Sequence, residues 1–135
     1  MIKKFEFLAH TSDLKIRAKG RSKNEVIENI VLGISEYISS GNVKKNDSER
    51  KITIQGKDSK EIVYRFVEEI LFLLETENFL AKKAKILLKD DRLIAVLKGE
   101  KVEGRNFAMI KAPTYSDMSL KKIGAFWILD IVLDI

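Results

Sequence analysis

Hydrophobic and basic residues alternate strictly between Leu14 and Gly20. A period of two is typical of a strand with one buried face and one solvent-exposed face. Residues 2–8 are rich in phenylalanine and precede a polar turn that starts at His10, so we expect them to pair with 14–20 as a hairpin. The pattern therefore predicts that a β-sheet begins near the N-terminus.

Two later segments show the three- and four-residue spacing of amphipathic helices. The first begins at Ser22, where a serine and a glutamate three residues apart have the spacing of a capping box, and it ends at the polar run 39–42. Its apolar positions predict one stripe that packs on the sheet. The second repeats the capping spacing at Asp58 and should extend to about Thr76.

The remaining segments return to a period of two. We expect a short strand over 52–55, a hairpin with strands over 84–89 and 93–97, and further strands over 105–112, 118–122 and 126–133. This order of elements is typical of an α+β fold: strands, a helix, a strand, a helix and then several strands. The sequence predicts a single domain over 1–135, with a mixed or antiparallel sheet and two main helices packed on one of its faces.

Composition narrows the class of protein. A chain of 135 residues, 45% hydrophobic and 33% charged, has the size and balance of one globular domain. The absence of cysteine excludes disulfides, thiolate nucleophiles, zinc ribbons and iron–sulfur clusters. The longest apolar segments are interrupted by charge, and the N-terminus lacks the apolar core of a secretory signal, so we expect a cytoplasmic protein that is not integral to a membrane. The net charge of +5 is compatible with an acidic or nucleic-acid partner without requiring one.

Two carboxylates interrupt the apolar run at the end of the chain. Asp130 and Asp134 share one face of the expected strand, but four residues separate them by about 13 Å, so they cannot bind one ion together. A site that uses Asp134 must recruit oxygens from elsewhere, and the carboxylate and carbonyl of Ile135 are within immediate reach. The alternative is a charged, frayed terminus.

Two further places gather polar groups. Residues 10–13, His-Thr-Ser-Asp, occupy a turn between strands, where Ser and Asp are also favoured for purely structural reasons. A Ser-His-Asp triad is rejected because such close neighbours on one turn rarely converge. The third place is Lys111, which precedes the chain's only proline and could equally be a solvated strand-end lysine. The sequence contains no Gly-rich phosphate loop, no paired-histidine metal motif and no basic helix laced with aromatics.

Taken together and in this order, these places resemble the archease family. The matching residues are His10-Thr11-Ser12-Asp13, the capped helix after Gly20, Lys111-Ala112-Pro113-Thr114-Tyr115 and the terminal Leu133-Asp134-Ile135. The resemblance covers essentially the whole chain, including its length. The chain departs from the family pattern at Ser12, Leu14-Lys15, Asn106 and Ser116, where the family usually has Ala, Val-Gly, His and His.

The resemblance implies an accessory protein with no turnover of its own. Archeases look like activators of the GTP-dependent RNA ligase that joins tRNA halves, promoting guanylylation and multiple turnover of the ligase. Contact with RNA and GTP would then be indirect, through the ligase. The ligase-activating candidates in this sequence are Asp13, Lys111 and Asp134.

The resemblance also implies a divalent cation, calcium in the first place with magnesium or manganese as alternatives, held by Asp13, Asp134 and Ile135. Hard oxygen donors without cysteine suit these ions far better than zinc or copper. We therefore expect Asp13 and Asp134 to come together across neighbouring strands. Two other classes of function remain open: an autonomous divalent-metal-dependent hydrolase and a basic RNA-binding chaperone.

Overall fold

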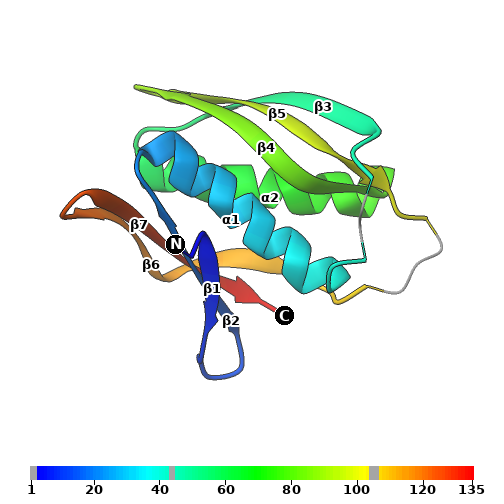
Figure 1. The fold of residues 1–135 in the computed structure, drawn as a ribbon, viewed down its shortest axis with the longest axis horizontal. Helices are drawn as coiled ribbons and strands as arrows, with labels where there is room; N and C mark the ends of the chain where they lie inside the picture. The colour runs from blue at the N-terminus through cyan, green and yellow to red at the C-terminus, as the bar shows by residue number, and fades with distance from the viewer. Residues whose placement is uncertain (1–2, 43–44, 104–106) are drawn as a thin grey trace.

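Both helices lie between two antiparallel sheets, which gives three layers (Figure 1). The computed structural model describes residues 3–42, 45–103 and 107–135. In chain order the elements are β1 (Phe5–Leu8), β2 (Leu14–Gly20), α1 (Lys23–Ser39), β3 (Ser48–Gln55), α2 (Ser59–Glu77), β4 (Phe79–Lys89), β5 (Arg92–Lys101), β6 (Ala112–Ile123) and β7 (Phe126–Asp134). The four-stranded sheet has the order β1-β2-β7-β6, and the three-stranded sheet has the order β3-β5-β4.

The α+β class is confirmed, but the expectation of one sheet covered on one face is wrong. The reason lies in α1, which is buried on more sides than its apolar stripe indicates. Gly33, Ser35 and Asn29 are buried together with the isoleucines and valines. On the four-stranded sheet, the Asn29 side chain donates to the Lys19 carbonyl over 2.7 Å. The three-stranded sheet is held to the other side of α1 by polar side chains, since the Glu28 carboxylate accepts from the Ile86 N–H over 2.9 Å and the Asn24 side-chain oxygen accepts from the Leu88 N–H over 2.8 Å.

The predicted helix starts are confirmed by their caps. The Ser22 hydroxyl accepts a hydrogen bond from the Glu25 N–H over 3.1 Å, and the Asp58 carboxylate accepts one from the Glu61 N–H over 2.8 Å. These side chains satisfy main-chain donors that the first turn of a helix leaves free. The first helix ends at Ser39 and a left-handed Ser40, within the polar run that predicted its end.

Most strands appear where alternation predicted them, and several are longer than expected. The strand at 14–20 has the predicted bounds, and β1 confirms the N-terminal hairpin, although residue 2 lies outside the described part of the chain. The strand expected over 105–112 is wrong. Residues 107–111 form no strand, Ala112 begins β6, and 105–106 are not described. The Ala108 N–H instead donates to the Ile38 carbonyl at the end of α1, over 3.1 Å.

Strand β7 lies in the middle of the four-stranded sheet, paired with β2 on one side and β6 on the other. Its residues 129–133 are buried. The β6–β7 register shifts between Thr114 and Ser119, where Asp117 adopts a left-handed φ of 55°. Within the described residues, neither helix is long and apolar enough to cross a membrane.

The three-stranded sheet depends on a close approach at Gly99, opposite Ala81 where the β4–β5 register shifts. A Cβ atom at Gly99 would collide with the carbonyl oxygen of Leu80. Gly99→Ala should therefore lower the free energy of unfolding by about 3 kcal/mol, because main chain must move. Gly124→Ala is the matched control: its φ is +61° but a Cβ there meets nothing within 4 Å, so we expect a loss of about 1 kcal/mol. Equilibrium denaturation measures both, and equal losses would contradict the close approach.

Candidate functional site at the end of β7

The pairing of β7 brings the separated sequence motifs to one edge of the four-stranded sheet. Leu14 pairs with Leu133 at the end of the β2–β7 ladder, so Asp13 and Asp134 are the next residue of each chain segment beyond this pair. On the other side of β7, Ala112 pairs with Asp134, and the Lys111 N–H donates to the Asp134 carbonyl over 2.7 Å.

The end of the chain is held in place and is open to solvent. Leu133 is completely buried, and the hydrogen bond from Lys111 fixes the Asp134 main chain. The alternative of a frayed terminus is therefore wrong up to Asp134. The side chains of Asp134, Lys111 and Ile135 are exposed, whereas Asp13 is half-buried. The site is an edge that a partner molecule can reach.

His10 joins this edge to the irregular part of β6. Its Nε2 lies 3.1 Å from Oδ2 of Asp117, and because a carboxylate only accepts hydrogen bonds, Nε2 carries the proton. Its Nδ1 is buried without a hydrogen-bond partner and lies 3.8 Å from Oδ2 of Asp13. The imidazole thus links the β1–β2 turn to β6 and borders Asp13. No local sequence pattern indicates this role of His10, since its partner Asp117 is 107 positions away.

Asp130 belongs to a different interaction. Arg17 donates to both carboxylate oxygens of Asp130, over 2.7 and 2.9 Å, and Lys15 lies 3.9 Å away. The hydrogen bonds to Asp130 raise the pKa of the Arg17 guanidinium. Arg17 and Asp130 face each other in the β2–β7 register, so the pair reinforces the alignment that puts Asp13 and Asp134 at the same end of the ladder. Asp130 is therefore engaged in the sheet and is separate from the candidate site.

A groove lies on the other side of the segment that contains Lys111. It has a volume of about 1440 Å³, and α2, the end of β3 and residues 107–113 line it. Phe72 and Met109 on its walls are exposed. Near it the rings of Tyr64 and Tyr115 stack with centroids 3.9 Å apart, and desolvation raises the pKa of the Tyr115 hydroxyl. Lys111 lines this groove and also joins the Asp134 edge through its main chain.

The donor set for a metal ion consists of few side chains. Within the ranges the structure describes, no group of three or more His, Cys, Asp or Glu side chains is arranged to hold a metal. The predicted set pairs two carboxylates, Asp13 and Asp134, with the main-chain oxygens of Ile135. These hard oxygen atoms fit calcium, magnesium or manganese, which accept water as further ligands.

Comparison with known proteins gives consistent results. Residues 5–135 match the model of the Archease protein family (MTH1598/TM1083). "Protein archease" of Sulfurisphaera tokodaii is 32% identical over 99% of this chain and 100% of that protein. The solution structure of Methanobacterium thermoautotrophicum protein 1598 superimposes with a TM-score of 0.81 at 25% identity, over 99% of this chain and 100% of the other.

A more distant structure shares the fold. The crystal structure of an archease and possible chaperone from Thermotoga maritima has a TM-score of 0.71 at 16% identity, over 95% of this chain and 94% of that one. "Protein archease" of Methanosarcina barkeri is 26% identical over 98% of this chain and 97% of its own length.

Removing Arg17 should destabilise the protein more than removing its partner Asp130. Arg17→Ala leaves the buried carboxylate of Asp130 without its bidentate partner, so we expect a loss of about 2–3 kcal/mol in unfolding free energy. Asp130→Ala should cost only about 1 kcal/mol, because the partly exposed guanidinium can turn to water. Urea denaturation of both variants checks the order, and an equal or reversed order would show that the pair does not hold the register.

Proposed function

Because the chain belongs to the archease family, we propose that it is an accessory protein that activates a GTP-dependent RNA ligase in the joining of tRNA halves. The activation would consist of promoting guanylylation of the ligase and its repeated turnover. The observation that supports this proposal is the β2–β7–β6 register, which collects Asp13, Asp134 and Lys111 at one solvent-exposed edge.

The edge suits insertion into the active site of a partner. Asp134 and Ile135 are exposed at the end of a strand whose preceding residues are buried, so a rigid sheet presents them. Asp13 and Asp134 would hold the divalent cation, with oxygens of Ile135 and water completing its ligands. When bound, the cation neutralises the two carboxylates and offers positive charge to a phosphate.

Two further groups would act at this edge. The Lys111 ammonium, a compact point charge, is suited to meeting a phosphate of the ligase–nucleotide complex. The His10 imidazole, hydrogen-bonded to Asp117 and 3.8 Å from Asp13, would position the Asp13 carboxylate. Nothing in this arrangement requires the chain to form or break a covalent bond, which is why we propose an activator.

The direct test is a ligation assay with tRNA halves, GTP and an excess of RNA over ligase. A small amount of this protein should convert a ligase that stops after one turnover into one that turns over many times. Ligation that is unchanged by the protein would contradict the proposal. Cleavage of RNA or hydrolysis of GTP by the protein alone would favour the autonomous hydrolase instead.

If Asp13 and Asp134 hold the cation, a variant that loses either carboxylate should lose both calcium binding and the stabilisation of the fold by calcium. At a calcium concentration of about 100 times Kd, binding should stabilise the wild-type protein by about 2.7 kcal/mol. Asp13→Asn and Asp134→Asn should each abolish this gain. Without metal, both variants should be at least as stable as wild type, because two carboxylates at one edge repel each other. Thermal unfolding with and without calcium measures the effect.

Asp91→Asn is the matched control, since this carboxylate is exposed in the β4–β5 turn, far along the chain from the edge. It should keep the calcium response of the wild type. The proposed calcium site would be wrong if Asp91→Asn lost the stabilisation by calcium, or if both Asp13→Asn and Asp134→Asn kept it.

Lys111 gives a prediction that separates phosphate contact from metal binding. Lys111→Ala should slow guanylylation of the ligase at limiting GTP and leave calcium binding unchanged. Lys111→Arg should rescue the rate only in part, because the guanidinium fork has a different reach. Stability should change by less than about 0.5 kcal/mol in either variant, as for other exposed side chains. A wild-type guanylylation rate in Lys111→Ala would show that Lys111 does not contact the phosphate and is an ordinary solvated lysine.

A further inference from the structure

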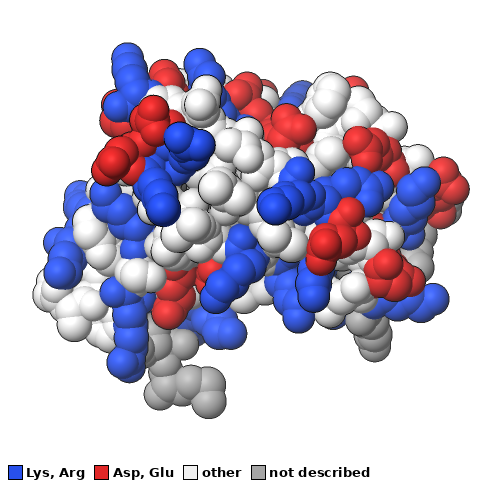
Figure 2. All heavy atoms as spheres, turned by 90° about the horizontal axis from the view of Figure 1, so that it is seen from above, with Lys and Arg blue, Asp and Glu red and all other residues white. Residues whose placement is uncertain are grey.

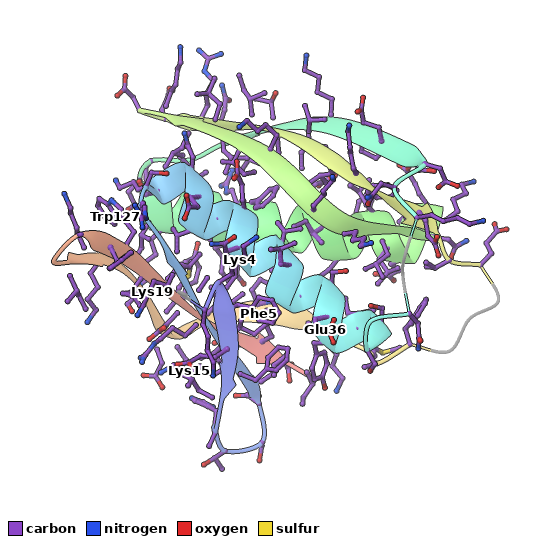
Figure 3. The ribbon with its side chains drawn as sticks, in the orientation of Figure 1. Lys4, Phe5, Lys15, Lys19, Glu36 and Trp127 are labelled. Atoms are coloured by element: carbon purple, nitrogen blue, oxygen red, sulfur yellow. The ribbon has the colours of Figure 1, made fainter. Side chains whose placement is uncertain are left out.

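A second concentration of functional side chains lies at the opposite end of the β6–β7 hairpin. Five basic residues, Lys19, Arg21, Lys23, Lys121 and Lys122, lie at this end of the sheet together with Phe126 and Trp127, whose side chains alternate between the two faces of β7, and we call these seven residues the hairpin-end cluster. The sheet register assembles it: Lys19 and Lys121 both pair with Ile128 from opposite sides of β7. Figure 3 labels Lys19 and Trp127 on the side where this hairpin ends.

The cations lie against the aromatic rings. The Lys23 ammonium is 5.0 Å from the centroid of the Trp127 ring. On the Phe126 ring, the Lys19 ammonium is 5.7 Å and the Arg21 guanidinium 6.0 Å from the centroid. These are distances at which the negative face of a ring attracts a cation. Lys121 and Lys122 are exposed, and Lys122 pairs with Trp127 in the β6–β7 register.

The cluster lacks compensating negative charge. Among the described residues, none of its five cations forms an ion pair with a carboxylate. The neighbouring acid Glu25 accepts a hydrogen bond from the Arg21 main chain and caps α1. Arg17, two residues from Lys19 on the same strand face, is by contrast fully paired with Asp130. Converging positive charges without counter-charges favour a polyanionic ligand.

We propose that the hairpin-end cluster binds single-stranded RNA directly, with phosphates on the basic side chains and an unpaired base stacked on Phe126 or Trp127. Cations that track a phosphate backbone beside aromatic stacking surfaces are the shared feature of proteins that bind single strands. Trp127 packs against the core and both rings are only partly exposed, so they offer a flat face for stacking and do not protrude as membrane anchors do.

This inference does not depend on the proposed ligase activation. Phe126 and Asp134 are eight residue steps apart on β7, which corresponds to about 27 Å along the strand. RNA bound at the hairpin end would therefore leave the Asp13–Asp134 edge free for a protein partner. RNA binding by this chain alone can succeed or fail independently of any effect on ligation.

The test uses a fluorescein-labelled single-stranded oligoribonucleotide of 20 nucleotides and the full chain, followed by fluorescence anisotropy. Neutralising five phosphates predicts a slope of about −3.5 for log K against log salt. Lys19→Gln combined with Arg21→Gln should reduce the slope by about 1.4 and weaken binding. Phe126→Leu should weaken binding at least about fivefold through loss of stacking.

The matched control removes two charges from another exposed face. This control is Lys83→Gln combined with Lys98→Gln. The two lysines pair with each other on the outer face of the three-stranded sheet, where Lys98 also pairs with Glu49. Basic and acidic side chains are interspersed on this face (Figure 2). This variant should keep at least half of the wild-type affinity. If it weakens binding as much as the Lys19 and Arg21 variant, the binding follows overall charge and the proposed site is wrong.

A second readout locates the bound RNA. Trp127 is the only tryptophan of the chain, so its fluorescence should be quenched as RNA saturates the protein, and this measurement needs no variant. RNA that binds without quenching Trp127 and binds Phe126→Leu as tightly as wild type would overturn the proposal. Polyglutamate that displaces the oligonucleotide at equal charge would also overturn it, and would favour an acidic protein as the partner.

Discussion

The register of β7 between β2 and β6 is the constraint on which both surfaces of the molecule depend. The Arg17–Asp130 pair lies at the middle of the β2–β7 ladder and is compatible with only one alignment. Side chains alternate between the faces of a strand, so a slip by one residue would turn the buried Leu129, Ile131 and Leu133 out of the core. The alignment that preserves the core is therefore the one that puts Asp13 and Asp134 at the same end of the ladder.

The same strand separates two kinds of chemistry. At its C-terminal end lie the two candidate carboxylates, together with Lys111 and Ile135. At its N-terminal end lie two aromatic rings with cations against them, and in the described part of the chain these cations form no ion pair with a carboxylate. A central strand paired on both sides is rigid, so the distance between a cation-binding edge and an RNA-binding end would be fixed. If both proposals hold, this arrangement would let the protein bind a ligase and RNA at the same time.

Local features of the fold could be predicted from sequence, and features made by long-range pairing could not. Helix caps at Ser22 and Asp58 and the alternation from Leu14 to Gly20 are signals contained in a few residues. The second sheet depends on long-range contacts, in which Asn24 and Glu28 of α1 accept hydrogen bonds from main-chain N–H groups of β4 about 60 positions away.

The candidate site likewise combines residues that the sequence indicates with contacts that only the fold creates. The Asp13, Lys111 and Asp134 motifs were found through a family resemblance, and the structure shows that strand pairing brings their main chains together. The contact of His10 with Asp117 joins residues 107 positions apart through an irregular stretch of β6, which no local pattern encodes. No single basic segment encodes the hairpin-end cluster, because β2, the start of α1, β6 and β7 each contribute part of it.

The most direct test of the cation-binding edge is a titration of the isotope-labelled protein with Mn²⁺, followed by NMR line broadening of its amide signals. A bound paramagnetic ion should first broaden the amides of Asp13, Lys111, Asp134 and Ile135, while the signals of the β6–β7 turn, about 27 Å away along β7, stay sharp. Early broadening in the β4–β5 turn at Asp90 and Asp91, with the Asp134 signals unaffected, would contradict the account.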